Sequence, residues 1–379
     1  MIIFRLENIH FEKGDSKIPL FLLYCAHLNQ LNNFEMKKII TVICFTLLSA
    51  TFVFAQPKIK LVSNSAEKKV DVMIGGKLFT SYIYPDNIKK PVLWPVVTAE
   101  GNEITRQFPM KNKEGERVDH PHHIGIWLNY GDVNGLDFWN NSEAISADRA
   151  DKFGTIYHET IESTKDGKGE ASLSTTASWK DNKGKTLLAE KTDFTFSAKG
   201  KTRIIDRTTQ LKAVNGKVDI TDNKEGMFAI RVTRALELPS KGKVKLVDSH
   251  GVVTEVDAAN DKTATGNYLS SEGVEGGDVW ATRAKWMKLY GELNGEKVAI
   301  VIFDHPGNAG YPTYWHARGY GLFAANTLGQ NVFSKGKEEM NLSLKDGETS
   351  TFRYRLAVFS GEPTNAEIEK MSKEYESKI

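Results

Sequence analysis

The sequence predicts an all-β protein, built as a large antiparallel two-sheet β-sandwich that ends in a short C-terminal helix. Apolar and polar residues alternate around Phe194 and Phe196 and again along residues 351–358, as in strands with one buried and one solvated face. Turn sequences such as Asn294-Gly295 recur between such segments and indicate hairpins. Helical periodicity is scarce before residue 363. Two packed antiparallel sheets are the natural architecture for this pattern.

The first 55 residues are expected to lie outside the working fold. Residues 1–35 are interpreted as an extension that precedes the true start. Residues 36–55 are interpreted as a signal peptide, with basic residues after Met36, an apolar run and a small residue at Ala55. Cleavage near Ala55 predicts a periplasmic or secreted protein. The alternative is a membrane anchor at residues 39–54, which is short compared with the usual span of about 20 residues.

Composition excludes several classes of protein. The formal net charge is +2, which gives no strong field for nucleic acid or for an anionic membrane. Both cysteines, Cys25 and Cys44, precede the predicted cleavage position. The mature chain is therefore expected to have no disulfide, no thiolate nucleophile and no cysteine-bound metal.

Residues 57–361 are expected to form a single β-sandwich domain, and residues 362–379 a C-terminal helix. The run at 298–303 is apolar throughout, which predicts a strand buried on both faces. Residues 257–279 are rich in Gly and Asp and are expected to form a long loop.

The C-terminal helix has its own signals. Ile368, Met371 and Tyr375 share one helical face, and either Thr364 or Asn365 is the expected cap.

Three segments concentrate polar, aromatic and titratable residues beside Gly and Pro: residues 119–139, 222–228 and 304–326. Five of the seven histidines after residue 55 lie in these segments, namely His120, His122, His123, His305 and His316. Histidine changes its protonation near neutral pH and is a common metal ligand. The clustering predicts a functional site, although each ring could instead be hydrogen-bonded in a loop or at the edge of the core.

Glu225, beside Lys224 and just before an expected strand, is a candidate general acid or base. The alternative is a solvated pair of charges in a turn. No cofactor is predicted. A divalent metal at His122, His305 and His316 is the weaker alternative, because their spacing fits none of the short zinc patterns.

Six motifs resemble a known family: LWPVVT at 93–98, DHPHHIGIW at 119–127, GDVNGLDFW at 131–139, KEG at 224–226, HPG at 305–307 and WHAR at 315–318. They are similar to a bacterial family of unknown function labelled "methane oxygenase PmoA", and the resemblance covers nearly all of residues 58–360. A membrane oxygenase is not implied, because the mature chain has no apolar run of about 20 residues. The resemblance implies a galactose-mutarotase-like supersandwich, a fold that hosts sugar epimerases, glycoside hydrolases and polysaccharide lyases.

We therefore expect an exported carbohydrate-active protein, with an enzyme of the hydrolase, lyase or epimerase type as the leading interpretation. The expected catalytic residues are His122, His123, His316 and Glu225. The expected substrate-binding residues, through ring stacking or hydroxyl contacts, are Trp127, Asn129, Asp137, Trp139, Tyr314, Arg318 and Asn326. The expected partner is a small-molecule or oligosaccharide substrate. The alternatives are a non-catalytic glycan-binding protein and a metal-dependent oxidase or hydrolase.

Overall fold

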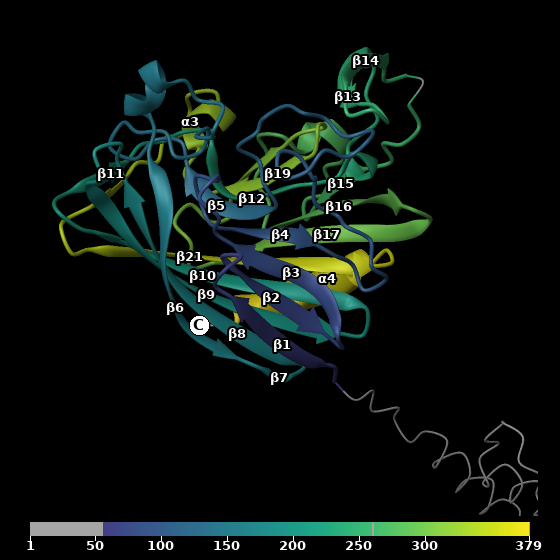
Figure 1. Cartoon of the computed structure of the whole chain (residues 1–379), viewed down its shortest axis with the longest axis horizontal. Helices are drawn as coiled ribbons and strands as arrows, with labels where there is room; N and C mark the ends of the chain where they lie inside the picture. Colours follow the sequence, from purple (N-terminus) through teal and green to yellow (C-terminus); the bar gives the residue numbers. More distant parts are fainter. Residues whose placement is uncertain (1–55, 260, 379) are drawn as a thin grey trace, which may run out of the picture. The chain divides into compact units, whose positions relative to one another are not determined.

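Alternating apolar and polar residues fold into two large antiparallel sheets (Figure 1). The structure is a computed structural model that describes residues 56–259 and 261–378. The predicted extension at 1–35 and the predicted signal peptide at 36–55 lie outside the described residues. Gln56–Ile379 forms one compact unit.

The first sheet has nine strands. In spatial order they are β18 (Tyr314–Ala317), β19 (Leu322–Asn326), β12 (Gly226–Arg231), β5 (Ile126–Tyr130), β4 (Val92–Val96), β3 (Lys77–Ile83), β2 (Lys69–Ile74), β1 (Lys58–Asn64) and β7 (Gly167–Lys168). The second sheet has eight strands. They are β15 (Asn267–Ser270), β16 (Trp286–Leu293), β17 (Glu296–Asp304), β21 (Thr349–Ser360), β10 (Thr202–Ala213), β9 (Thr186–Lys199), β8 (Glu170–Lys180) and β6 (Thr155–Lys165).

Shorter elements occupy the connections. Two small pairs of strands are β11 (Val218–Ile220) with β20 (Leu342–Leu344) and β13 (Lys243–Val247) with β14 (Val253–Asp257). The helices in the described part of the chain are α3 (Gln330–Phe333) and α4 (Asn365–Glu376), with 3-10 turns η2 (Ala147–Lys152), η3 (Arg234–Leu236) and η4 (Gly276–Val279). No helix within the described residues is long and apolar enough to cross a membrane.

The facing sides of the two sheets form the main hydrophobic core. Phe228 of β12 stacks on Tyr354 of β21 with ring centres 4.9 Å apart, and Phe79 of β3 meets the edge of Phe196 of β9 at 6.5 Å. All four side chains are buried. Such aromatic pairs add about 0.5–1.5 kcal/mol beyond the burial of their area. The predicted all-β, two-sheet sandwich with a short C-terminal helix is confirmed.

The strand β17 is buried on both faces, as the apolar run at 298–303 predicted. Ile300 and Ile302 belong to the core between the sheets, whereas Val301 and Phe303 belong to a cluster that α4 completes. The helix therefore covers the outer face of the eight-stranded sheet.

The packing of α4 also affects the burial of polar residues on the neighbouring strand β21. The alternation at 351–358 predicted a solvated outer face, and this prediction is wrong for Arg355. Its side chain is buried, and it donates two hydrogen bonds to Asp206, at 2.6 and 2.7 Å. Its guanidinium lies 4.6 Å from the ring centre of Tyr375 in α4. The polar residues at these positions pair with each other beneath the helix instead of facing water.

The segment 257–279, predicted as a long loop, contains the strand β15. Tyr268 of β15 pairs with Leu289 of β16 and is fully buried. The segment also contains the last residue of β14, Asp257, and all of η4. The prediction failed because an apolar stretch this short gives no measurable periodicity.

Helix α4 begins at one of its two predicted caps. The Thr364 side chain accepts a hydrogen bond from the Glu367 N–H at 3.3 Å, and the Glu367 carboxylate accepts one from the Thr364 N–H at 2.8 Å. This reciprocal arrangement is a capping box. Thr364 is therefore the cap, and Asn365 is the first helical residue.

We expect Thr364→Ala to lower the free energy of unfolding by about 1 kcal/mol, because it leaves a helix N–H without its acceptor. Urea denaturation followed by circular dichroism measures this loss. Asn365→Ala, at the exposed neighbouring position, is the control and should change stability much less. Equal losses in the two variants would show that the capping contact does not stabilise the helix.

Candidate functional site

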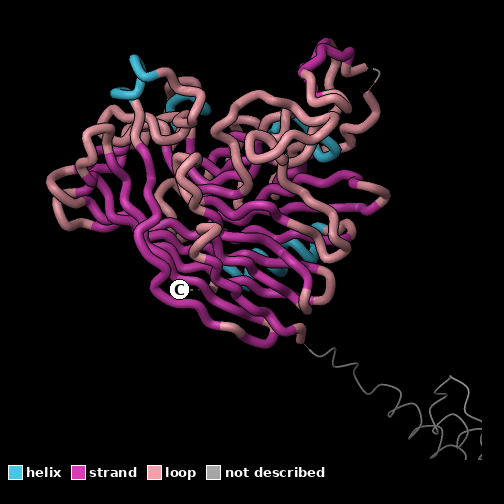
Figure 2. Tube along the Cα trace, in the orientation of Figure 1, coloured by secondary structure: helices cyan, strands magenta, loops and turns pink. Residues whose placement is uncertain are grey.

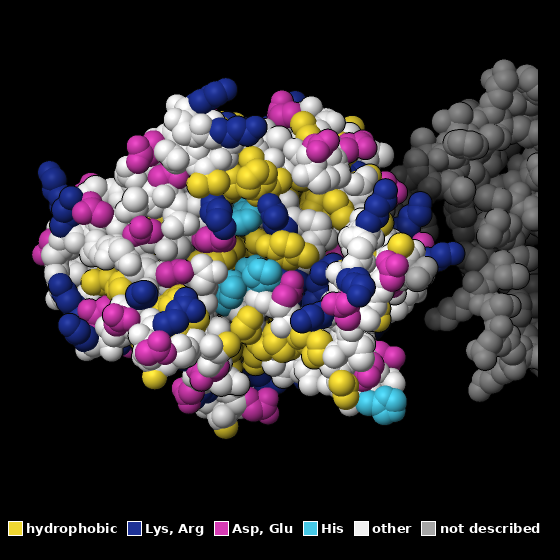
Figure 3. Space-filling model, turned by 90° about the horizontal axis from the view of Figure 1, so that it is seen from above, with side chains coloured by type: hydrophobic (Ala, Val, Ile, Leu, Met, Phe, Trp, Pro, Cys, Tyr) yellow, Lys and Arg dark blue, Asp and Glu magenta, His cyan; other side chains and the backbone are white. Residues whose placement is uncertain are grey.

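The predicted segments contribute to the outer face of the nine-stranded sheet, opposite the core between the sheets. Four residues that pair with one another across neighbouring strands form a row, called here the register row. They are Trp127 on β5, Ala229 on β12, Ala324 on β19 and His316 on β18. Neighbouring strands lie about 4.8 Å apart, so the backbones of Trp127 and His316 are separated by about 14 Å. Loops gather over this face (Figure 2), and histidine, basic and hydrophobic side chains crowd its middle (Figure 3).

Two buried arginines hold residues 119–123 against this face. Arg106 donates hydrogen bonds to the Asp119 carboxylate at 2.7 Å and to the backbone carbonyls of Asp119, His120 and His123 at 2.7, 2.8 and 3.1 Å. Arg231 of β12 donates to the same carboxylate at 2.6 Å. Burial raises the pKa of Asp119, but its hydrogen bond with His120 and the two arginines outweigh burial and hold that pKa well below its usual range.

The backbone of this loop is restrained on both sides. His120 has a φ of 45°, a region that L residues rarely adopt, and its carbonyl is held by Arg106. Gly125 follows with a φ of 56°, and a Cβ there would lie 2.1 Å from the Leu93 carbonyl oxygen. Only glycine lets the loop approach β4 so closely.

Aromatic rings form a column from the loop to the sheet. Tyr320 stacks on His120 with ring centres 5.0 Å apart, His120 on His123 at 4.9 Å, and His123 on Trp127 at 5.2 Å. The Nδ1 atom of His123 lies 3.3 Å from an Arg231 nitrogen. Because a guanidinium can only donate, this Nδ1 accepts and Nε2 carries the proton. Half-buried Tyr320 and His120 form the accessible end of the column.

Burial keeps the two lower histidines neutral. It lowers the pKa of His122 to about 2 and that of His123 well below its usual value, and neighbouring positive charges act in the same direction. Neither ring is protonated near neutral pH, so neither can donate a proton as an imidazolium. His123 is 1% exposed, and the stacked ring of His120 separates it from solvent.

His316 and Glu225 form a pair at the other end of the register row. The His316 Nδ1 donates to the Lys224 carbonyl oxygen at 2.9 Å and lies 3.7 Å from the Glu225 Oε2. Burial lowers the pKa of His316 to about 4, and the Glu225 carboxylate opposes this shift. Because Nδ1 carries the proton, the lone pair of the neutral ring is on Nε2. The Glu225 side chain is 18% exposed and also contacts the Lys224 ammonium.

The predicted stacking residues do not offer free ring faces. Trp127 and Trp139 are 0% exposed, in a cluster beneath the loops. Tyr314 is buried, donates to Glu338 at 3.2 Å and has the Arg283 guanidinium 4.3 Å from its ring centre. Stacking of a sugar on these three rings is therefore contradicted by the structure. Strand alternation put the tryptophans on the predicted face, but the connecting loops cover them.

The predicted polar contacts divide into two groups. Asn326 is buried, donates to the Asn223 carbonyl at 2.9 Å and accepts from the N–H groups of Leu328 and Gly329, so it is fully used inside the fold. Asn129 is also buried and donates to the Phe138 carbonyl at 2.7 Å. Neither can bind a sugar hydroxyl from solvent in this structure.

Asp137 and Arg318 stay accessible. Burial raises the pKa of half-buried Asp137, and the Glu225 charge adds to the shift, although hydrogen bonds from Asn140 oppose it. Arg318 is exposed, with its guanidinium 5.4 Å from the Trp280 ring centre and 5.9 Å from that of Tyr320. These two remain candidates for ligand contact.

His305 does not belong to this face. Its Nδ1 accepts from the Gly307 N–H at 3.0 Å, and its Nε2 lies 2.8 Å from the Lys378 carbonyl oxygen, so the ring ties down the C-terminus. Within residues 56–259 and 261–378 no group of three His, Cys, Asp or Glu side chains could hold a metal ion. The structure therefore does not bring His122, His305 and His316 together as one group of ligands.

Sequence reasoning missed four residues of the site. Arg106 and Arg231 position the histidine loop, Tyr320 caps the ring column, and Lys90 lies beneath it with its Nζ 5.3 Å from the Trp127 ring centre. Lys90 is 2% exposed, whereas adjacent Lys89 pairs with Glu143 near the surface. No pattern in the sequence distinguishes these two lysines.

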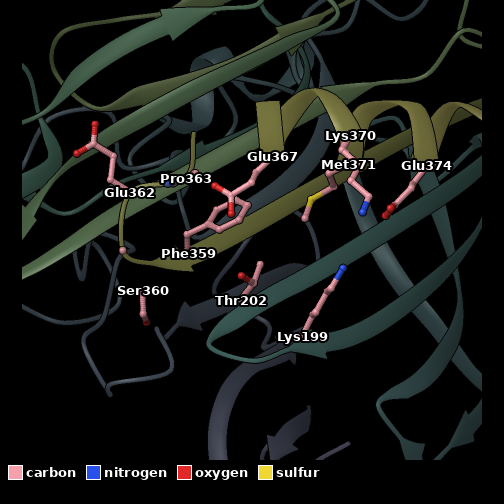
Figure 4. Close-up of a pocket in the computed structure, with 11 residues that line it drawn as sticks. Lys199, Thr202, Phe359, Ser360, Glu362, Pro363, Glu367, Lys370, Met371 and Glu374 are labelled. Carbon is pink, nitrogen blue, oxygen red and sulfur yellow. The ribbon is translucent and has the colours of Figure 1, made fainter. Parts of the chain in front are cut away.

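Two hollows differ in their chemistry. One of about 170 Å³ lies beside the histidine loop and is lined by Lys90, His122, Asn141 and Ser142 among others. Another, of about 440 Å³, lies between α4 and the turn from β9 to β10 (Figure 4), where Phe359 and Met371 are flanked by charged side chains of both signs. The second hollow contains no histidine and is on the opposite side of the sandwich.

The fold and the site define a two-sheet β-sandwich with a histidine-rich outer face. The chain belongs to the family of unknown function DUF6807, which it matches over residues 69–373. No curated protein matches it in sequence.

Several solved structures are similar to the chain. A galactosidase domain of an alpha-galactosidase–sucrose kinase matches with 8% identity and a TM-score of 0.41, over 79% of this chain and 42% of that one. A galactose mutarotase-like protein from Clostridium acetobutylicum matches with 11% identity and a TM-score of 0.35, over 81% and 99%. Another, from Lactobacillus casei, has 8% identity and a TM-score of 0.28, over 79% and 100%. Because these identities and TM-scores are low, the similar structures carry no argument about function, and support for a function must come from this chain's own side chains.

Proposed function

We propose that the chain is an exported carbohydrate-active enzyme that binds a sugar over the outer face of the nine-stranded sheet. His316 and Glu225 transfer the proton. The observation that carries this proposal is their geometry: a neutral imidazole with a fixed tautomer, 3.7 Å from a carboxylate that is 18% exposed. The fold alone would not specify an activity.

The chemistry of the pair is that of a general base with a charge-stabilising partner. The Lys224 carbonyl holds the proton on His316 Nδ1, which leaves the Nε2 lone pair to accept a proton from the substrate. The imidazolium that forms is then stabilised by the Glu225 carboxylate beside it. When the proton returns to another position of the sugar, His316 acts as the acid. Epimerases, lyases and glycoside hydrolases all use proton transfer by a positioned side chain.

Ligand contacts are assigned to the side chains that remain accessible. Arg318 and Asp137 would bind hydroxyl groups, and Tyr320, the outermost ring of the column, is the ring on which a sugar could stack. This assignment replaces Trp127, Trp139 and Tyr314, which are covered. Relation to the PmoA-labelled family, on the motifs at 93–98, 119–127, 131–139, 224–226, 305–307 and 315–318, is part of the proposal, but oxygenase activity is not.

We expect Glu225→Gln to lower kcat/KM by about 100-fold, because the imidazolium at His316 loses its counter-charge. The assay offers the purified protein a panel of oligosaccharides, keto-sugars and uronides. Glu339→Gln, which changes an exposed carboxylate, is the control and should retain full activity.

Turnover that is unaffected by Glu225→Gln would exclude this pair as the catalytic group. Sugar binding without turnover of any saccharide would favour the non-catalytic glycan-binding alternative.

A further inference from the structure

We propose that the hollow lined by Lys90 and His122 is a subsite for the carboxylate group of an acidic sugar. This inference rests on the proposed function, because it names the substrate class: a uronate rather than a neutral sugar. Neither Lys90 nor its hollow is used by the proton-transfer pair: Lys90 lies beside Trp127 at one end of the register row, and His316 is at the other end.

Lys90 is a buried amine, and when it is protonated no carboxylate around it balances its charge. Its ammonium carries three N–H donors, and one of them donates to the His122 carbonyl oxygen at 2.7 Å. Its Nζ also lies 5.3 Å from the Trp127 ring centre. Lys90 makes no salt bridge with any carboxylate in the described part of the chain. A buried ammonium without a counter-ion is unfavourable, so the position favours an anion supplied from outside.

His122 provides a second polar group at the same hollow. Its side chain is 8% exposed, and its Nε2 is fully buried without a hydrogen-bond partner among the described residues. A neutral imidazole can donate from this nitrogen. Asn141 and Ser142 line the hollow as well, and its volume of about 170 Å³ exceeds the space that a carboxylate group needs.

Two acidic side chains lie near the hollow, and neither neutralises Lys90. Glu143 lines it, but its carboxylate is 60% exposed and pairs with Lys89 at 2.5 Å. Asp137 acts on Lys90 only at longer range, and its oxygens accept hydrogen bonds from Asn140 at 2.9 and 2.7 Å. The anionic position beside Lys90 is therefore left for a ligand.

The hollow is close to the accessible end of the ring column. The His122 ring lies edge-on to His120, with centres 5.6 Å apart, and His120 stacks on Tyr320. A sugar that lies against Tyr320 and the edge of the His120 ring would have the Lys90–His122 hollow at one side. A carboxylate on the ring or on the next sugar of a chain could enter it.

Binding should also be linked to proton uptake. Burial lowers the pKa of Lys90 to about 7, so part of the protein carries a neutral amine at pH 7.5. A carboxylate beside the amine favours the charged form. Glucuronate binding at pH 7.5 should therefore take up a proton.

The test is calorimetric titration of the Glu225→Gln protein with D-glucuronate and with D-glucose, in two buffers of different ionisation heat. The catalytically impaired background removes turnover from the comparison. We expect glucuronate to bind at least 10-fold more tightly than glucose, with proton uptake. Lys90→Met should abolish the preference, Lys90→Arg should retain it, and the control Lys68→Met, at an exposed salt bridge, should behave as the parent.

Equal affinity for the two sugars, or a preference that survives Lys90→Met, would overturn the proposal. Acetate provides a probe that needs no sugar. At constant ionic strength it should shift the NMR signal of the Trp127 indole, and Lys90→Met should remove this shift; no response to acetate would also overturn the proposal. A glucuronate preference without turnover of any saccharide would leave the subsite intact and refute only the catalytic role.

Discussion

Three buried histidines are expected to lower the free energy of unfolding as the pH falls from about 6.5 toward 4, because they remain neutral in the folded protein. Burial lowers the pKa of His122 to about 2, that of His316 to about 4 and that of His123 well below its usual value of 6.5. Below pH 6.5 the unfolded chain binds protons that the folded chain does not. Each histidine then removes about 1.4 kcal/mol of stability per pH unit, down to its folded pKa.

Buried acids act in the opposite direction. Burial raises the pKa of Asp304 to about 7 and also raises the pKa values of Asp137 and Glu237. A group with a raised pKa contributes stability that is lost as the pH rises through that value, so acidification restores it. The pH dependence of the free energy of unfolding of the native protein is therefore a sum of contributions of both signs. The contribution of a single histidine to this pH dependence is obtained by comparing a variant that lacks it with the native protein.

His316→Asn retains a donor near the Nδ1 position and removes the titrating ring. Between pH 6.5 and 5, the native protein should lose about 2 kcal/mol more stability than this variant. Urea denaturation at the two pH values measures the difference. His250→Asn, at an exposed turn, is the control and should follow the native protein. Equal losses in all three proteins would mean that His316 takes up its proton in the folded state.

The fold class could be predicted because strand periodicity is local. The alternation at Phe194 and Phe196 and the apolar run at 298–303 each record the burial of one strand without knowledge of its partners. What could not be predicted depends on long-range packing. The alternation along β21 places Arg355 on the face that was expected to be solvated, but α4 packs over this position and buries it.

The site was predictable in part for the same reason. Motif residues identified the segments that meet on one face, and they included His316 and Glu225, which lie side by side. Strand alternation also places Trp127 on the correct side of the sheet, but exposure depends on loops that have no periodicity. The buried position of Lys90 beside half-buried Lys89 likewise follows from tertiary packing alone.

Replacement of Arg106 with methionine is expected to lower the free energy of unfolding by about 3–5 kcal/mol. Arg106 is 1% exposed, and its guanidinium joins the Asp119 carboxylate to the backbone carbonyls of Asp119, His120 and His123. Methionine fills a similar volume but donates no hydrogen bond. Three carbonyls would lose their donor, and the carboxylate would keep Arg231 as its remaining guanidinium partner.

Two further variants separate charge from geometry in this loop. Arg106→Lys keeps the positive charge but lacks the planar fork that reaches several oxygens at once, so we expect it to lose an intermediate amount of stability. Arg149→Met changes an exposed arginine and should alter stability by less than about 0.5 kcal/mol. Urea denaturation at pH 7 ranks the three proteins. If Arg106→Met were no more destabilised than Arg149→Met, water would be satisfying the loop carbonyls. The histidine column would then be held by ring stacking rather than by the arginine.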